Sequence, residues 1–197
     1  MLNTTKLDVS SPIWERFFSV FPLVLIGSRD AENSYDLAPK HMAMPFSWNN
    51  HFGFVCAPHH RTYQNIRDRH EFTVSYPRPS QIVITSLAAD PRSVDDTKPA
   101  LKALPIFKAE KIDGVFVQDA YLFLECRLEK IIDDIGGNSL IIGEVAAAQV
   151  DNEFLRIAER DDQELIHASP LLAYLYPGRF GKITQSYSFP FPKGFSR

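Results

Sequence analysis

The segment from His59 to Arg67 combines residue types that could bind an anion. Two histidines and Arg61 come just before Thr62, a favoured helix N-cap residue, and Asn65 follows three positions later. This spacing predicts a short helix that starts near Thr62. Free backbone N–H groups at a helix start favour negative charge, and the Arg61 guanidinium adds a planar, permanently charged set of donors. The segment therefore predicts a phosphate site; the alternative is a plain capped helix with solvated basic side chains.

The other histidines and the glycines form no recognisable metal or nucleotide motif. Four histidines are conceivable metal ligands, namely His41, His51, His59 and His60. They lack the paired spacing of a zinc site and no cysteine joins them, so we predict no metal. No Gly-x-Gly-x-x-Gly follows a predicted strand, so the sequence predicts no resident dinucleotide. NAD(P)H would then be a transient substrate.

Two cysteines and two glutamates are further candidates for reactive groups, namely Cys56, Cys126, Glu125 and Glu144. Both cysteines lie inside apolar runs, which predicts buried thiols, and Cys56 is the less inert because it lies close to basic residues. Glutamates in mid-strand usually point to solvent or pair with a neighbour such as Arg127, so we expect a structural role. The sequence assigns no catalytic residue.

Composition limits the classes to which the protein can belong. With 197 residues and 45% hydrophobic content the chain can bury a full core, and we expect one domain over residues 1–197. A net charge of −3 and a pI near 6.1 give no general attraction to nucleic acid or to an anionic membrane. The N-terminus lacks a signal pattern, no window approaches about 18 apolar residues, and the cysteines are unpaired. We expect a cytoplasmic protein.

Short β-prone runs dominate the first half of the chain. A serine, a proline and helically spaced apolar residues between positions 11 and 18 predict a leading helix within residues 1–20. Apolar or alternating runs predict strands at residues 22–28, 34–39, 52–57 and 71–76. Turn residues from Asp30 to Asn33 would join the first two strands as a hairpin.

The strongest hairpin signal lies in the second half. Residues 121–129 alternate in polarity, and one face of this run carries Leu122, Leu124, Cys126 and Leu128. A Gly-Gly-Asn turn at residues 136–138 leads to a partner strand at residues 139–150.

The remaining segments are less regular. Residues 82–88 form an apolar run that fits a helix or a strand, and residues 98–104 predict a short helix. The tail, residues 171–197, is rich in aromatic residues, proline and glycine. Six or more strands with short inserted helices predict a mainly β fold, in the form of a closed antiparallel barrel.

Four short segments together resemble a known family. They are Asp36-Leu37-Ala38-Pro39, Arg61-Thr62-x-x-Asn65-Ile66, Phe123-Leu124-Glu125-Cys126 and Ile142-Gly143-Glu144-Val145. In this order and spacing they resemble segments of the flavin reductase-like family. The resemblance runs from about Phe21 to Phe180 and implies that family's fold, an antiparallel, Greek-key-like FMN-binding split β-barrel.

The resemblance also implies a cofactor site. In this family FMN lies at a dimer interface with its phosphate near the Thr-x-x-Asn helix start, and FAD is an alternative. The implied cofactor contacts are Ala38, Lys40, His41, Met42, Ser47, His60, Arg61, Thr62, Asn65, Arg179 and Phe180. Residues 40–44 would run along the isoalloxazine ring. Residues 176–180 align with a segment that closes over the site, so residues 171–197 are expected to cover the site or a partner; the alternative is a plain surface turn.

The chain departs from the family pattern at segments that are expected to contact the flavin and the nicotinamide. Many two-component flavin reductases carry Gly-Asp-His, with the histidine near the nicotinamide, where this chain has Gly137-Asn138-Ser139. Lys40-His41-Met42 stands where small hydroxyl or aromatic residues are usual, and Ser47-Trp48-Asn49-Asn50-His51 stands where Ser-x-Asp-Pro-Pro is usual. The polar edge of the flavin is therefore expected to be bound differently, and the histidine associated with NAD(P)H is missing.

Three functional hypotheses follow. The first is a homodimeric NAD(P)H:flavin reductase that passes a hydride through FMN to free flavin or a small acceptor. The second is a flavoredoxin-like electron-transfer protein that a partner protein reduces, which the missing Gly-Asp-His pattern favours. The third is a split-barrel relative that has lost flavin and binds another ligand. Expected partners are a second copy of the chain, flavin, nicotinamide, and an oxygenase or electron-transfer protein.

Overall fold

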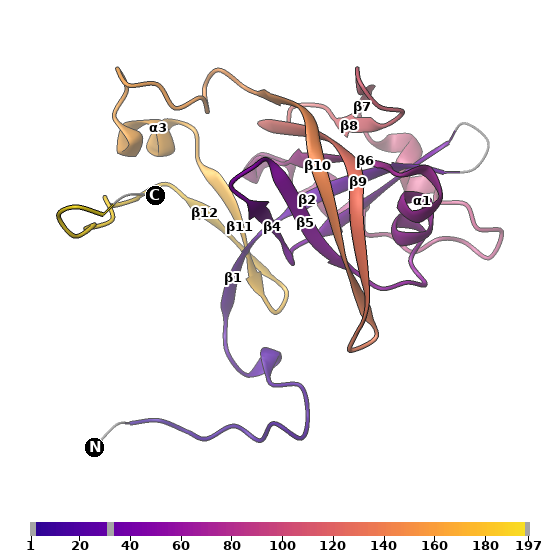
Figure 1. Ribbon diagram of the computed structural model, residues 1–197, viewed down its shortest axis with the longest axis horizontal. Helices are drawn as coiled ribbons and strands as arrows, with labels where there is room; N and C mark the ends of the chain where they lie inside the picture. The colour runs from indigo at the N-terminus through magenta and orange to yellow at the C-terminus, as the bar shows by residue number, and fades with distance from the viewer. Residues whose placement is uncertain (1–2, 31–33, 196–197) are drawn as a thin grey trace.

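Strands make up most of the structure, a computed structural model that describes residues 3–30 and 34–195. With η marking a 3-10 helix, the elements in chain order (Figure 1) are η1 Trp14–Arg16, β1 Ser19–Pro22, β2 Val24–Arg29, β3 Tyr35–Lys40, β4 Ala43–Ser47, β5 His51–Cys56, α1 Arg61–Arg69, β6 Glu71–Tyr76, η2 Pro79–Gln81, α2 Ile82–Leu87, η3 Pro99–Ala103, β7 Ile106–Lys108, β8 Val115–Val117, β9 Leu122–Ile135, β10 Asn138–Val150, α3 Asp162–Ala168, β11 Leu171–Tyr176 and β12 Arg179–Ile183. The predicted strands and the β2–β3 and β9–β10 hairpins are therefore confirmed. Of the predicted turn between β2 and β3, residues 31–33 lie outside the described ranges.

A curled antiparallel sheet of seven strands, in the order β3-β2-β6-β9-β10-β5-β4, forms the body of the molecule (Figure 1). Gly136 and Gly137 adopt φ values of 57° and 81° in the turn between β9 and β10, as a tight hairpin requires. The register shifts at three places along this hairpin, and such irregularities increase the local twist of a sheet. The sheet does not close, because the edge strands β3 and β4 do not pair with each other. The prediction of a closed barrel is wrong in this respect.

The curl of the sheet encloses the main core. Buried residues from β2, β5, β6, β9 and β10 meet there, with Tyr63 and Ile66 of α1 packed against them. Cys126 belongs to this cluster and Leu124 and Leu128 pack against it, so three of the four residues predicted on the inward face of β9 are confirmed, and Leu122 is not among them. The core therefore fixes α1 against the sheet and sets the direction of its N-terminus.

Strand β2 is buried on both faces, which explains its continuous apolar run. Its second face packs in a smaller cluster with Leu37, Ala88, Leu104, Val115 and Val117. This cluster brings the segment after α2 over β2 and β3. The run at residues 82–88, which the sequence left open between helix and strand, forms helix α2.

The predicted leading helix is wrong except for one turn, η1, and residues 19–22 form a strand that pairs with β11. The start of η1 has no side-chain cap, and Phe17 and Phe18 are 41% and 67% exposed. A short helix without tertiary packing is unstable in water, so the local pattern alone does not produce one.

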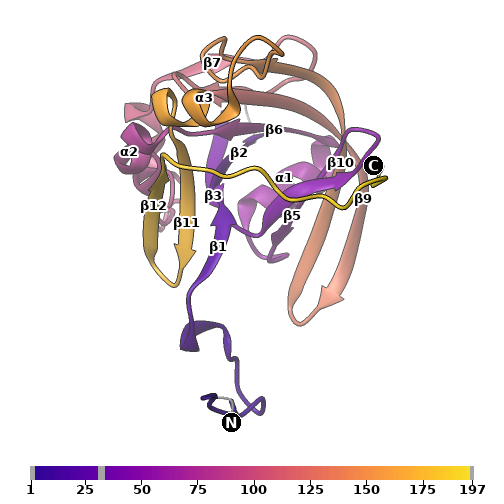
Figure 2. The same ribbon diagram turned by 90° about the vertical axis from the view of Figure 1, so that its left-hand side faces the viewer.

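The strands β1, β11 and β12 form a second antiparallel sheet. Figure 2 shows β11 and β12 beside α2, with the segment after β12 crossing in front of the main sheet toward the C-terminus. In the described ranges, no helix combines the length and the hydropathy that crossing a membrane would need.

Candidate functional site

A basic cavity of about 440 Å³ lies where β5 passes into α1. Strand β3, the N-terminus of α1 and the segment after α2 line it, with the residues Asp36, Ala38, Pro39, Lys40, His59, His60, Arg61, Thr62, Ala88, Ala89, Pro91, Arg92 and Lys98. The predicted cofactor contacts Ala38, Lys40, His60, Arg61 and Thr62 therefore share one cavity. Two of the cations, Arg92 and Lys98, were not predicted.

The N-cap of helix α1 is His60, two residues before the predicted Thr62, and it makes no side-chain cap bond. Thr62 lies inside the first turn, where it is 2% exposed and its hydroxyl donates to Asp36 Oδ2 at 3.3 Å. A capping side chain belongs to the residue before the first helical one, and that residue is His60 rather than Thr62. Asn65 donates to Ser28 Oγ at 3.1 Å and does not line the cavity. Thr62 is thus not an N-cap, and Asn65 ties α1 to β2.

Aspartates hold the cations of the cavity in place. Arg61 pairs with Asp30, at 3.6 Å from its Nε, and with Asp96. Arg92 donates to Asp30 Oδ2 at 2.6 Å and to Asp36 Oδ1 at 3.2 Å. Charged partners on both sides fix these guanidinium groups, so they do not need to be ordered by a ligand.

Lys98 is the most buried cation of this group, with a side chain 8% exposed. Its Nζ donates to the carbonyl oxygens of Leu37 at 2.9 Å and Ala88 at 2.6 Å, and lies 3.8 Å from Asp36 Oδ1. Burial lowers the pKa of Lys98, and Asp36 opposes this shift. Partial burial also lowers the pKa of His60, with a smaller contribution from Lys40.

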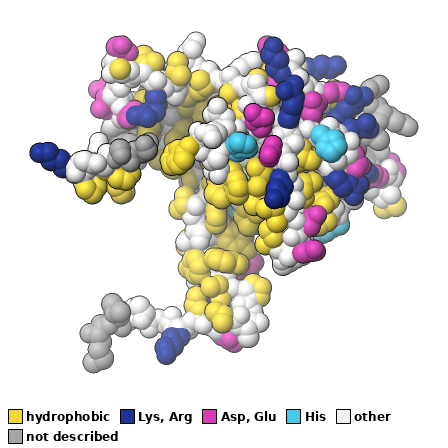
Figure 3. Space-filling model, viewed as in Figure 1, with side chains coloured by type: hydrophobic (Ala, Val, Ile, Leu, Met, Phe, Trp, Pro, Cys, Tyr) yellow, Lys and Arg dark blue, Asp and Glu magenta, His cyan; other side chains and the backbone are white. Residues whose placement is uncertain are grey.

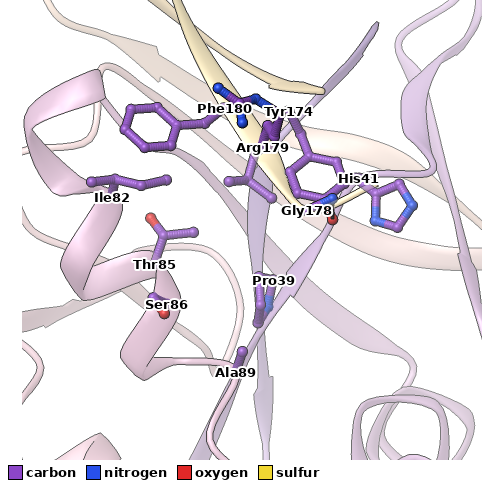
Figure 4. Close-up of a pocket in the computed structure, with 11 residues that line it drawn as sticks. Pro39, His41, Ile82, Thr85, Ser86, Ala89, Tyr174, Gly178, Arg179 and Phe180 are labelled. Atoms are coloured by element: carbon purple, nitrogen blue, oxygen red, sulfur yellow. Dashed lines mark hydrogen bonds between the residues drawn. The ribbon is translucent and has the colours of Figure 1, made fainter. Parts of the chain in front are cut away.

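Figure 4 shows the residues that line a second, mostly apolar cavity, which has a volume of about 350 Å³. Its lining residues are Leu23, Pro39, His41, Ile82, Thr85, Ser86, Ala89, Tyr174, Gly178, Arg179 and Phe180. Pro39 and Ala89 line both cavities, so the two are adjacent, and we call them together the groove, with a basic end and an apolar end. Residues 176–180 supply the β11–β12 turn, which brings Arg179 and Phe180 to the apolar end.

His41 lies at the apolar end among aromatic rings. Its ring centroid is 4.8 Å from that of Tyr174 and 5.5 Å from those of Tyr176 and Phe21. Burial lowers the pKa of His41, and the charge of Lys40 adds to the shift. The imidazole is therefore neutral at pH 7 and can offer one donor and one acceptor to a ligand.

Two other predicted contacts line neither cavity. Met42 is 45% exposed between β3 and β4. Ser47 hydrogen bonds to His51 Nδ1 at 2.7 Å at the start of β5, whereas the basic segment follows the end of that strand. Because a strand rises about 3.3 Å per residue, Ser47 lies roughly 16 Å from the basic end. Neither residue reaches the groove of its own chain.

The residues predicted to be structural have defined partners. Glu125 is 2% exposed and accepts from the backbone N–H groups of Glu110, Lys111 and Ile112 at 3.1, 2.6 and 3.1 Å, so its expected exposure or pairing with Arg127 is wrong. Glu144 on β10 and Glu71 on β6 are the glutamates that lie across from Arg127. Both cysteines are buried, which confirms the prediction of buried thiols, and burial raises their pKa values.

The groove as a whole suits a ligand with an anion at one end and a planar apolar group at the other. The basic end offers charge-assisted donors, and the apolar end offers aromatic and aliphatic walls. Sequence patterns point to Arg61 because it stands at a helix start. Sequence patterns do not indicate Arg92 and Lys98, because the position of the loop that carries them depends on the second core.

Several solved structures share the fold of this chain. A flavoredoxin from Methanosarcina acetivorans is 17% identical with a TM-score of 0.77, over 98% of both chains. A 2-nitrobenzoate 2-nitroreductase from Pseudomonas fluorescens is 20% identical with a TM-score of 0.79, over 98% of this chain and 99% of that chain. Component B of a nitrilotriacetate monooxygenase from Bacillus cereus is 15% identical with a TM-score of 0.80, over 96% of this chain and 100% of that chain.

These likenesses establish the fold, and the sequence establishes the family. The solved relatives are flavin reductase-like split barrels, so the fold implied by the four sequence segments is confirmed. The family description of the flavin reductase-like domain matches residues 19–176, which spans both cavities except for the start of β12. The chain belongs to the flavin reductase-like family.

Proposed function

We propose that the protein is an FMN-dependent oxidoreductase, an NAD(P)H:flavin reductase that passes a hydride to free flavin or to a small acceptor. The observation that carries this proposal is the groove, with a basic end next to an apolar end. The FMN phosphate would bind Arg61, Arg92 and Lys98 at the basic end. The flavin ring would lie along residues 38–41 toward the apolar end.

Bound FMN would supply the hydride-carrying chemistry, so the chain itself needs no dedicated acid or base. The tasks of the protein are to hold the phosphate, to orient the ring and to leave one ring face open. Neutral His41 would offer a hydrogen bond to the polar edge of the ring. Arg179 and Phe180 would contact the ring or the incoming nicotinamide from the β11–β12 turn.

A spectroscopic titration tests this proposal. Protein purified without added flavin is titrated with FMN, and NADH or NADPH is then added under anaerobic conditions. We expect saturable binding of FMN, followed by bleaching of the oxidised flavin band. Failure to bind FMN would refute the proposal.

A flavoredoxin-like electron carrier is the second candidate, and the environment of Ser139 favours it. This residue is part of the segment that stands where many relatives carry Gly-Asp-His. Ser139 is fully buried, and its hydroxyl donates to Asp133 at 2.6 Å, so it is not available to a nicotinamide. Binding of FMN without bleaching by either nicotinamide would support this candidate.

We further propose that the protein is a homodimer that works in the cytoplasm, with an oxygenase or electron-transfer protein as a partner. The outer side chains of edge strand β4 and its flanks support the dimer, since Met42, Met44, Phe46 and Trp48 are 45%, 54%, 40% and 92% exposed. Apolar edges are usually covered. Figure 3 shows hydrophobic side chains gathered in the hollow between the body and the C-terminal tail, and along the strand that leads to the N-terminus. A second copy of the chain would cover this surface.

A further inference from the structure

Three aspartates contact the cations of the basic cavity, and they differ in burial. Asp36 and Asp30 are 3% and 8% exposed, whereas the side chain of Asp96 is 55% exposed. Removing one partner of a buried pair leaves a charge without compensation, which is strongly destabilising. In an exposed ion pair, one charged group can be replaced by another with little loss of free energy. Asp96 is therefore the carboxylate that a ligand could replace.

Asp36 has a fixed role in this arrangement. It stands where relatives carry the asparagine of Asn-x-Ala-Pro, and its carboxylate accepts from Thr62 and Arg92 and pairs with Lys98. Both cations belong to the segment after α2, far from β3 in the sequence. The negative charge of Asp36 thus draws Arg92 and Lys98 into the cavity.

Asp96 reaches Arg61 from a short exposed loop. The loop is closed by bonds from Ser93 N to the Thr97 carbonyl at 2.7 Å and from Asp96 N to the Ser93 carbonyl at 2.9 Å. Arg92 Nη1 donates to the carbonyl of Asp96 at 2.5 Å and lies 3.7 Å from Asp96 Oδ1, while Asp96 Oδ2 pairs with Arg61. An anion thus already sits on the guanidinium that faces the cavity.

The charges of the cavity match this exchange. Four cations, Lys40, Arg61, Arg92 and Lys98, meet three carboxylates in the folded chain, which leaves one positive charge. Release of Asp96 leaves two. A phosphate monoester carries about −1.5 to −2 charges at pH 7.

We propose that Asp96 occupies the place of a ligand phosphate on Arg61, and that a phosphate monoester dianion displaces it. The basic cavity then selects FMN over riboflavin through an exchange of one carboxylate for one phosphate. Asp36 is the positioning residue that holds Arg92 and Lys98 ready for it. This inference rests on the proposed function, because it takes FMN as the ligand.

Opposite effects of neighbouring aspartates test the proposal. FMN and riboflavin are each titrated into the wild type, Asp96→Asn, Asp36→Asn and the control Asp95→Asn. Asp95 is exposed and its carboxylate accepts from Thr97, so its substitution should change neither affinity. We expect FMN to bind Asp96→Asn about two- to fivefold more tightly, the range of one exposed ion pair. We expect FMN to bind Asp36→Asn at least about tenfold more weakly, and riboflavin to bind all four proteins equally.

The possible outcomes distinguish failure of the proposed exchange between Asp96 and phosphate from failure of the proposed function. Equal or weaker binding of FMN to Asp96→Asn would overturn the exchange, while FMN binding to the wild type would leave the proposed function standing. Binding of neither flavin to the wild type would refute the proposed function itself. If Asp36→Asn does not fold by circular dichroism, Arg92→Met replaces it and should weaken FMN but not riboflavin.

Discussion

Arg61 extends its guanidinium into the basic cavity from the first residue of α1. We predict that Arg61→Ala combined with Thr62→Ala weakens FMN binding more than tenfold, on the order of 1.5–3 kcal/mol for hydrogen bonds to a charged group. Most of this loss should come from Arg61, because the Thr62 hydroxyl is already bonded to Asp36. Quenching of flavin fluorescence measures the affinity. Arg67→Ala, on the exposed side of the same helix, is the matched control, and equal losses in both proteins would contradict the assignment.

His41 gives the folded protein a pH dependence of known sign. Its pKa is lowered in the folded state by burial, so the unfolded chain takes up the proton first as the pH falls below about 6.5. The free energy of unfolding should therefore decrease from that pH downward until the folded pKa is reached. Urea unfolding at about pH 7.5 and about pH 5.5 measures this decrease, and His41→Gln should reduce it. The exposed His167→Gln should leave it unchanged, and the same pH dependence in His41→Gln would exclude His41 as a cause.

Glu125 anchors a loop through three backbone N–H groups. We predict that Glu125→Gln lowers the free energy of unfolding by about 1.5–3 kcal/mol, because an amide cannot replace the charged acceptor. Denaturant unfolding is the measurement. Glu129→Gln, exposed on the same strand, should cost little, and a similar cost for both would argue against the buried anchor.

At the scale of elements, the contact between β2 and β8 depends on one missing side chain. A Cβ atom on Gly27 would overlap the side chain of Thr73 and the backbone carbonyl of Val115. We predict that Gly27→Ala costs about 1–3 kcal/mol or more of stability, since overpacking forces the backbone to shift. A Cβ on Gly181 meets only Leu175, at 3.6 Å, so Gly181→Ala should be nearly neutral. Thermal unfolding compares them, and a neutral Gly27→Ala would show that the two strands can separate.

The contact between β2 and β8 also affects the basic cavity. Strand β8 and the residues near Ala88 share the second core with β2 and β3, and the loop that carries Arg92 and Lys98 connects them. The position of these cations therefore depends on packing at the back of β2. Gly27→Ala should accordingly weaken FMN binding as well as stability.

At the scale of the whole molecule, the exposed apolar side chains of β4 predict self-association. We expect light scattering after size exclusion to give twice the chain mass of 22.4 kDa. Met44→Glu combined with Trp48→Glu should give a monomer, because charges on both sides of the contact would be buried without partners. Val94, fully exposed on a loop, provides the control Val94→Glu, which should remain dimeric. A monomeric wild type would refute the proposed dimer.

The sequence by itself determined most elements and one end of the site. Alternation and turn chemistry are properties of neighbouring residues, so the β2–β3 and β9–β10 hairpins and the inward face of β9 could be predicted. The basic turn before α1 was visible for the same reason. The leading helix failed because η1 finds no surface to pack against, and short helices need one.

Only the tertiary structure decided how the site is assembled. Thr62 and Asp36 are 26 positions apart, and Arg92 and Asp30 are 62 apart, so no local pattern could join them. Glu125 is buried rather than solvated because a loop from residues 110–112 offers it three donors. A buried charge takes whatever partner the fold brings within reach. The partner is set by packing between distant segments, and it decides which charges remain available to a ligand.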